Sequence, residues 1–328
     1  MQPFTFERAT DLDKAIATVS GQPDATFVAG GTELVNWLKE GIARPARIVD
    51  INALPLQGIE LEGNTLRLGA LARISDVAAH REVRLRFPAL ADALESSASG
   101  QLRNMASIGG NLMQRTRCPY FRAETELACN KRRPGSGCAA RNGWTRSAAI
   151  FGWSDACVAT HPSDLAVALA ALEATVHVRG PAGTRYLPLD VFYRLPGDEP
   201  ARETSLRHGE LIVAVELPAT PLAARSRYLK IRERSSYEFA LVSAAAAVVL
   251  DGNRIGSARL ALGGVAAMPW RNVDAERRLA GVALDGAALA NALTELFAEA
   301  LPLEHNAFKI DLARRTAVRA LLMAGGAA

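Results

Sequence analysis

The glycine pair in "FVAGGTEL" places the strongest constraint on how this chain can fold. Residues 25–29 have the apolar character of a buried strand and residues 32–40 that of a helix, so the glycines must form a tight turn between the two. A second apolar strand follows at 46–52. The sequence therefore predicts a small β-α-β unit.

Patterns elsewhere predict an α+β chain in two parts, 1–220 and 221–328, joined by a Pro- and Ala-rich stretch at 218–224. From Tyr228 the pattern changes to long strands, and a "DGN" turn between two apolar runs indicates a β-hairpin. The other expected helices are 10–19, 75–80, 88–99, 163–173, 285–300 and 310–323, and the other expected strands are 64–73, 174–180 and 210–218.

The composition is that of a soluble globular protein, with 49% apolar and 22% charged residues. The longest purely apolar stretch, 244–250, is far too short to cross a bilayer. The N-terminus has neither the basic region nor the apolar region of a secretory signal, so we expect no export signal on this chain. A reducing compartment disfavours disulfides, which shifts the expected role of cysteines towards metal binding or redox chemistry.

The glycine turn also has a chemical use. Glycines let the backbone approach a ligand closely, and the N-terminus of the following helix presents free amides to an anion. Together these features would suit a pyrophosphate group. The turn lacks the third glycine of the dinucleotide fingerprint, so a tight strand-to-helix turn without a ligand is the alternative explanation.

Three later elements could add to the same site. "NMASIGGN", residues 104–111, is a second glycine turn with small polar side chains. Asp164 in "THPSDLA" stands in the first turn of a helix, where capping and dipole compensation would explain it without a ligand. Lys230 in "YLKIRERSSYEFALVSAA" could touch a phosphate or a ring oxygen, although most lysines are merely solvated.

Taken in order along the chain, these elements and the strand "ELIVAVELP" resemble the FAD-binding subunits of the molybdenum hydroxylases, the family of xanthine dehydrogenase, aldehyde oxidoreductase and carbon monoxide dehydrogenase flavoproteins. The resemblance spans nearly the whole chain. It implies a two-part FAD-binding domain over 1–220, with a small β-α-β subdomain and a larger mixed α/β subdomain, followed by a C-terminal domain of antiparallel strands and helices. The residues that it would place around FAD are Phe27, Val28, Ala29, Gly30, Gly31, Thr32, Glu33, Leu34, Ser107, Gly110, Asn111, Asp164, Ile212 and Lys230.

All four cysteines, Cys118, Cys129, Cys138 and Cys157, fall within residues 112–160. This stretch carries eight Lys or Arg against three acidic residues, so the basic character of the chain is concentrated here. No C-x-x-C pair is present, which argues against a zinc knuckle and a ferredoxin-type run. Four thiolates are a full ligand set for a 4Fe-4S cluster, and nearby cations would offset its negative charge. Structural zinc, two disulfides, a reactive thiol and a nucleic-acid surface are the alternatives.

In most family members a short connection joins the second glycine turn to the "P-x-SD" turn, whereas 49 residues separate Asn111 from His161 here. This insertion resembles those that hold a 4Fe-4S centre in the flavoprotein subunits of periplasmic-type aldehyde oxidoreductase and of 4-hydroxybenzoyl-CoA reductase. The resemblance implies that the four cysteines bind such a cluster. Backbone amides of the turn-rich segment 134–137 could then hydrogen-bond to cluster sulfurs.

The resemblance also implies a subunit of a heterotrimer, because nothing in the chain looks like a molybdopterin site and no cysteines remain for 2Fe-2S clusters. A large molybdopterin-binding partner would oxidise an aldehyde, and a small 2Fe-2S partner would carry the electrons to FAD on this chain. FAD would pass them to an external acceptor. The 4Fe-4S centre could act as a relay, an electron store or a scaffold.

Several alternatives to this function remain open. A xanthine dehydrogenase or 4-hydroxybenzoyl-CoA reductase type of complex is the alternative within the family. A stand-alone flavin oxidoreductase and a zinc or nucleic-acid binding module are the alternatives outside it. Export to the periplasm would need a signal on a partner subunit, and without one the complex would be cytoplasmic.

Overall fold

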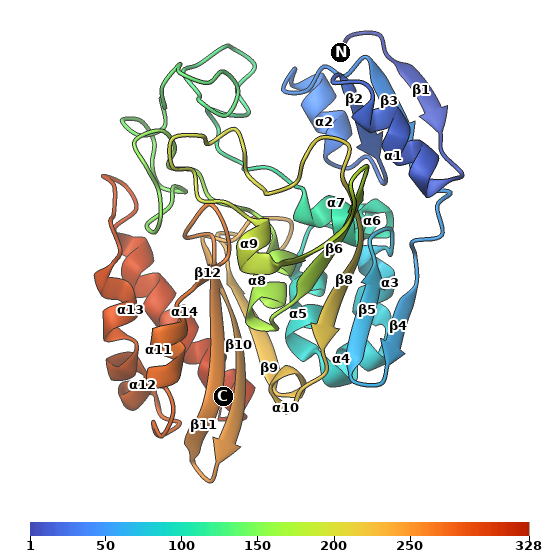
Figure 1. Ribbon diagram of the computed structural model, residues 1–328. Coiled ribbons are helices and arrows are strands. Elements are labelled where there is room, and N and C mark those ends of the chain that lie inside the picture. Colours follow the sequence, from blue (N-terminus) through green and yellow to red (C-terminus); the bar gives the residue numbers. More distant parts are fainter. Residues whose placement is uncertain (328) are drawn as a thin grey trace.

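The computed structural model describes residues 1–327 and contains three β-sheets, which follow one another along the chain (Figure 1). Helices cover the sheets, and the expected α+β class is confirmed. No helix in this described stretch is both long and apolar enough to span a membrane.

The N-terminal part is a three-stranded parallel sheet in the order β1-β3-β2. The predicted β-α-β unit is present, because α2 connects the parallel strands β2 and β3. The sequence does not predict β1, since three of its four residues are exposed and show no apolar alternation. The elements are β1 (Thr5–Arg8), α1 (Leu12–Ser20), β2 (Ala25–Val28), α2 (Leu34–Lys39) and β3 (Arg47–Asp50).

The second part is a five-stranded antiparallel sheet in the order β4-β5-β8-β6-β7, with helices packed on it. Its strands are β4 (Ile59–Glu62), β5 (Thr65–Gly69), β6 (Thr175–Gly180), β7 (Gly183–Pro188) and β8 (Leu211–Pro218). Its helices are α3 (Ile74–Ala79), α4 (Arg81–Arg86), α5 (Pro88–Ser96), α6 (Gly100–Met105), α7 (Ile108–Leu112), α8 (Asp164–Ala171), α9 (Leu189–Phe192) and α10 (Pro221–Ala224).

The C-terminal part is a four-stranded antiparallel sheet in the order β12-β11-β10-β9. The predicted hairpin is present, with Gly252 at a φ of +56° between β10 and β11. Its elements are β9 (Ser226–Ile231), β10 (Val242–Asp251), β11 (Arg254–Gly263), β12 (Trp270–Arg271), α11 (Val273–Arg278), α12 (Gly286–Ala292), α13 (Thr294–Ala298) and α14 (Phe308–Gly325).

The helix expected at 285–300 is wrong as a single element, because the structure divides it at Leu293 into α12 and α13. The hydroxyl of Thr294 donates to the carbonyl oxygen of Ala290 at 3.3 Å. Such back-bonding by a β-branched residue competes with regular helix geometry and often bends helices.

Helix α8 joins the second and third parts. Seven of its eight residues are buried. Leu165 and Leu169 pack in the core of the five-stranded sheet, whereas Val167, Ala168 and Ala171 pack against the four-stranded sheet. A helix covered on both faces must be apolar all round, which explains the sequence "DLAVALAA".

The cysteine insertion, residues 112–160, is irregular and lies at the upper left of Figure 1, in green. Beyond Leu112, which ends α7, it contains only isolated β-bridges. Its base is narrow, because the Ser163 hydroxyl donates to the side-chain oxygen of Asn111 at 2.6 Å. The elements before and after the insertion therefore remain neighbours.

We expect Leu169→Ala to lower the stability of the fold by about 2–5 kcal/mol, because it leaves a cavity beside a helix that both sheets cover. Leu85→Ala is the control, since Leu85 is also helical but 60% exposed, and it should change stability by less than about 0.5 kcal/mol. Urea unfolding followed by circular dichroism measures both. Equal midpoints for the two variants would contradict the central position of α8.

Candidate functional site

The first glycine turn packs against the end of α6. A Cβ at Gly30 would lie 1.8 Å from the carbonyl oxygen of Met105, and Gly31 has a φ of +72°. Packing of the turn itself thus requires both glycines. Within residues 1–327 the amides of Gly30, Gly31 and Thr32 donate no hydrogen bond to another backbone group. These amides therefore remain available to an anion. The glycines thus have a structural role and can also contribute to a binding site.

The second glycine turn is held against β5 and β8. Ser107 caps α7 by accepting a hydrogen bond from the amide of Gly110 at 3.2 Å. A Cβ at Gly109 would lie 3.1 Å from the Cβ of Ala70 and 3.6 Å from that of Ile212. The turn therefore brings small polar groups close to the start of β8.

Asp164 forms a buried polar group with two residues of β9. The Lys230 ammonium donates to one carboxylate oxygen at 2.7 Å, and the Tyr228 hydroxyl donates to the other. Burial raises the pKa of Asp164, although Lys230 and Tyr228 act in the opposite direction. Capping alone does not explain Asp164, because Ser163 is the residue that caps α8. Lys230 is itself buried and so is not an ordinary solvated lysine.

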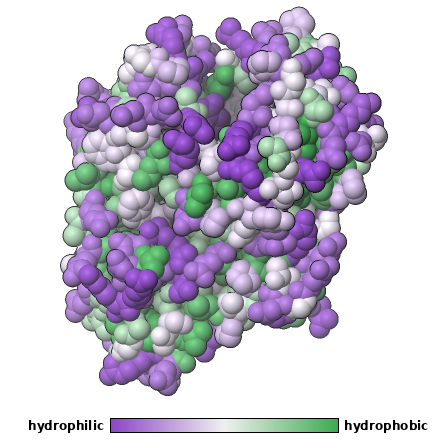
Figure 2. Space-filling model, in the orientation of Figure 1, coloured by the Kyte–Doolittle hydropathy of each residue, from purple (hydrophilic) through white to green (hydrophobic). Residues whose placement is uncertain are grey.

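All fourteen residues that the sequence associates with FAD line one cleft of about 450 Å³. Figure 2 shows the molecular surface hollowed at its upper edge, between the N-terminal part and the cysteine insertion. The cleft is also lined by Arg117 and by Tyr237, Glu238 and Phe239 of the C-terminal part, which the sequence did not single out. The guanidinium of Arg117 lies 4.8 Å from the centre of the Phe239 ring. Only the folded chain brings these two distant segments together.

The four cysteines line one small cavity, together with Tyr120 and Phe121. All four are free thiols, so the disulfide alternative is wrong for this structure. Residues Cys129 and Cys138 face each other in an antiparallel β-bridge. Gly135 and Gly137 have φ angles of +82° and +93°, which confirms the expected tight turns between these cysteines.

Cys118 and Cys157 do not have the properties of a catalytic nucleophile. Burial raises the pKa of Cys118, and it raises the pKa of Cys157 to about 11. A reactive cysteine needs the opposite shift. Among residues 1–327, no group of three or more Cys, His, Asp or Glu side chains is arranged to hold a single metal ion.

Most of the basic residues of the insertion are engaged in ion pairs and do not form a free cationic surface. Four of them form ion pairs with carboxylates outside the insertion, namely those of Glu33, Glu40 and Glu203. The full set of pairs is Arg115–Glu203, Arg117–Glu33, Arg122–Glu33, Arg122–Glu40, Lys131–Glu203, Arg133–Glu126, Arg141–Asp155 and Arg146–Glu233. The remaining cation, Arg132, donates to backbone carbonyl oxygens. This arrangement speaks against a nucleic-acid surface.

A third cavity, of about 70 Å³, lies between the cysteine cavity and the cleft. It shares Cys118 with the former, and Arg117 and Asp164 with the latter. His161 and Ser243 also line it, and each has a buried side-chain atom without a hydrogen-bond partner in the described chain. Burial lowers the pKa of His161 to about 4, so its imidazole is neutral at pH 7.

We expect Gly30→Ala to weaken FAD binding at least about tenfold, because the new methyl group would displace the turn from Met105. Gly100→Ala is the matched control, since a Cβ there would meet no atom within 4 Å. Titration of the full chain with FAD, followed by flavin fluorescence, gives both dissociation constants. Unchanged affinity in Gly30→Ala would remove this turn from the binding site.

Two family models cover this architecture. The model of the FAD binding domain in molybdopterin dehydrogenase matches residues 2–220, and that of the CO dehydrogenase flavoprotein C-terminal domain matches residues 227–324. The aldehyde oxidoreductase FAD-binding subunit PaoB of Escherichia coli K12 is 48% identical over 318 residues, which cover 96% of each chain. The carbon monoxide dehydrogenase medium chain of Hydrogenophaga pseudoflava is 27% identical, over 85% of this chain and 81% of that one.

Solved structures show the same fold. The carbon monoxide dehydrogenase of Hydrogenophaga pseudoflava superposes with a TM-score of 0.75 at 27% identity, and quinoline 2-oxidoreductase of Pseudomonas putida 86 with 0.77 at 24%. Each match covers 99% of this chain and 98% of the other. The chain therefore belongs to the FAD-binding subunits of the molybdopterin dehydrogenases, the molybdenum hydroxylase family, and is an oxidoreductase subunit.

Proposed function

We propose that this chain is the FAD and 4Fe-4S subunit of a heterotrimeric molybdenum-dependent aldehyde oxidoreductase. The proposal rests on two observations. The fourteen residues named from the sequence all line one cleft, and four free cysteines surround a nearby cavity. Electrons would arrive from 2Fe-2S clusters of a small partner and leave to an external acceptor. The substrate would be oxidised on a molybdopterin-binding partner.

The cleft fits FAD in its chemistry. The free amides of the first glycine turn would hold the pyrophosphate, as hydrogen-bond donors suit an anion. The Lys230 ammonium donates to Asp164, which Tyr228 holds from its other oxygen, and to the carbonyl oxygen of Ser96, so it has a defined position at the cleft wall. Bound FAD supplies the capacity to take up electrons singly or in pairs, and the chain supplies position and electrostatics.

The cysteine cavity fits a cluster better than a single metal ion. In a cubane each thiolate binds a different iron, so the four sulfurs are spread more widely than the ligands of one zinc ion. Four free thiols around a common cavity agree with such a spread. Because burial raises the pKa of Cys118 and of Cys157, binding of the cluster as thiolates would release protons from these two residues.

We expect the purified full chain to contain iron, acid-labile sulfide and FAD. Cys118→Ser should lose most of the iron, because one of the four thiolates is then missing. Asn142→Ser is the control, since Asn142 is exposed on the same insertion. Metal analysis and visible spectroscopy measure these contents. A colourless chain that holds zinc in place of iron would overturn the cluster assignment.

Aldehyde is proposed as the substrate class because the relative with 48% identity is an aldehyde oxidoreductase subunit. The assembled complex should reduce an artificial electron acceptor when an aldehyde is added. Xanthine serves as the control substrate, since another relative, 27% identical, is a putative xanthine dehydrogenase subunit. Reduction with xanthine and not with aldehydes would overturn the substrate assignment while leaving the flavin subunit in place.

A further inference from the structure

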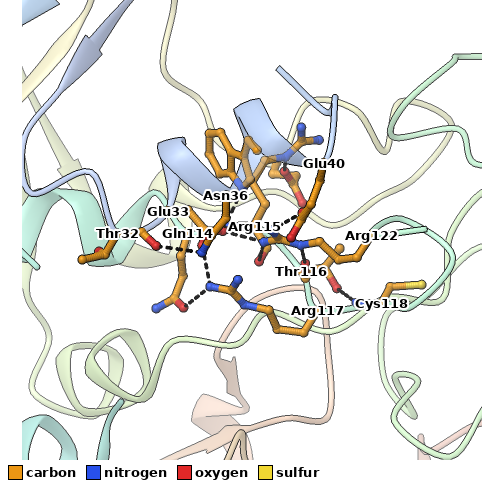
Figure 3. A network of polar contacts seen from close by, with 12 residues as sticks. Thr32, Glu33, Asn36, Glu40, Gln114, Arg115, Thr116, Arg117, Cys118 and Arg122 are labelled. Atoms are coloured by element: carbon orange, nitrogen blue, oxygen red, sulfur yellow. Dashed lines mark hydrogen bonds and ion pairs between the residues drawn. The ribbon is translucent and has the colours of Figure 1, made fainter. Parts of the chain in front are cut away.

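Glu33 connects the first glycine turn to the cysteine insertion (Figure 3). Its side chain is 14% exposed and accepts four hydrogen bonds. Trp37 of α2, the helix that begins directly after Glu33, donates one at 2.9 Å. The other three donors belong to the insertion, namely the amide of Arg115 at 3.1 Å and the guanidinium groups of Arg117 and Arg122, each at 2.6 Å.

The insertion is also tied to the connection that leads to β8. The Lys131 ammonium donates to Glu203 at 2.8 Å and to the carbonyl oxygen of Pro200 at 2.9 Å, and Arg115 pairs with the same carboxylate. Glu203 lies in the connection that leads to β8, and the first residue of that strand, Leu211, lines the cleft. The insertion therefore bridges two parts of the chain that form the flavin cleft.

Hydrogen bonds of Arg122 connect the segment around Cys118 to the glycine turn. Its Nε donates to the carbonyl oxygen of Thr116 at 3.0 Å, and the Thr116 hydroxyl accepts from the amide of Cys118 at 3.2 Å. Its two other nitrogens bind Glu33 and Glu40. Arg122 does not line the cleft, so it can influence a ligand there only through its neighbours.

We propose that the cysteine insertion is a clasp on the flavin cleft, so that occupancy of the cysteine site and affinity for FAD are thermodynamically coupled through Arg122 and Glu33. Arg122 is a positioning residue in this scheme. The inference rests on the proposed function, because it takes a 4Fe-4S cluster as the occupant. Coupling of this kind is reciprocal: bound FAD must raise retention of the cluster by the same factor.

The sign of the coupling follows from charge. The insertion has no helix or strand beyond Leu112. Its residues Ile150 and Phe151 pack in the core of the C-terminal part, but residues 113–148 add no member to the large apolar cores, so the order of this segment would depend on the iron-sulfur cluster. Loss of the cluster would loosen the arginines around Glu33. The Glu33 carboxylate would then stand uncompensated beside the turn that receives the FAD pyrophosphate, and the two anions would repel.

The first test uses the unaltered full chain, whose folding is not at risk. FAD affinity is measured by flavin fluorescence before and after anaerobic removal of iron with a chelator. We expect removal to weaken binding at least about fivefold, the lower end of typical coupling between sites. Conversely, saturation with FAD should slow the loss of iron to the chelator.

The second test compares two arginines of the insertion. Arg122→Gln should weaken FAD binding at least about fivefold in the iron-loaded chain, and should have little further effect in a Cys118→Ser background. Arg133→Gln is the matched control, because Arg133 is 65% exposed and pairs only with the exposed Glu126. It should bind FAD like the unaltered chain.

A rescue variant separates charge compensation from a general loss of structure. Glu33→Gln combined with Arg122→Gln removes the carboxylate that has lost one of its two guanidinium partners, so it should recover part of the affinity lost in Arg122→Gln. No recovery would overturn the role of charge in the coupling. If the chain holds iron but binds FAD equally well before and after the iron is removed, the proposed coupling is wrong and the cluster assignment stands. A chain that holds no iron would overturn the cluster assignment and the clasp together.

Discussion

The hydrogen bond from the Ser163 hydroxyl to Asn111 is the constraint on which the arrangement of the two sites depends. The same hydroxyl accepts from the amide of Ala166 and so caps α8, while Asn111 lies in α7. The insertion therefore begins beside one helix end and returns beside another. Closing a long loop costs little more entropy than closing a shorter one, so the core can accommodate the extra chain without rearrangement.

Ion pairs of buried and partly buried carboxylates hold the insertion and the C-terminal part in position against the rest of the chain. Asp164 pairs with a lysine of β9, Glu33 with arginines of the insertion, and Glu203 with both a lysine and an arginine of the insertion. Removing one partner of a buried ion pair is costly, because the other charge is left without compensation. These pairs are therefore better regarded as fixing relative orientation than as a net source of stability. They also explain why a strongly basic segment does not present a cationic surface.

Local patterns were sufficient to predict much of the fold. The glycine turn, the apolar α8 and the "DGN" hairpin depend on neighbours in sequence, and each was correct. Strand β1 was missed because most of its residues are exposed and show no apolar alternation, and α12 and α13 were merged because their apolar periodicity continues across the break.

The sequence likewise predicted only a part of the candidate site. Its fourteen residues could be named from motifs, but the partners of the basic residues could not, since Glu33 and Arg122 are 89 positions apart. Nor could the sequence place Phe239 beside Arg117, because that contact depends on how the C-terminal part docks. Pairing between distant charges is set by tertiary structure, which carries no local signal.

The cavity between the cysteines and the cleft has a consequence for how the two sites influence each other. Its volume of about 70 Å³ is several times the roughly 10–15 Å³ that one water molecule requires, and the unpartnered polar atoms of His161 and Ser243 in its lining favour hydration. Internal solvent would raise the local dielectric and weaken any direct field across the gap. If the proposed FAD and iron-sulfur cluster occupy the two sites, a change of oxidation state at one would then affect the other mainly through movement of the side chains that connect them.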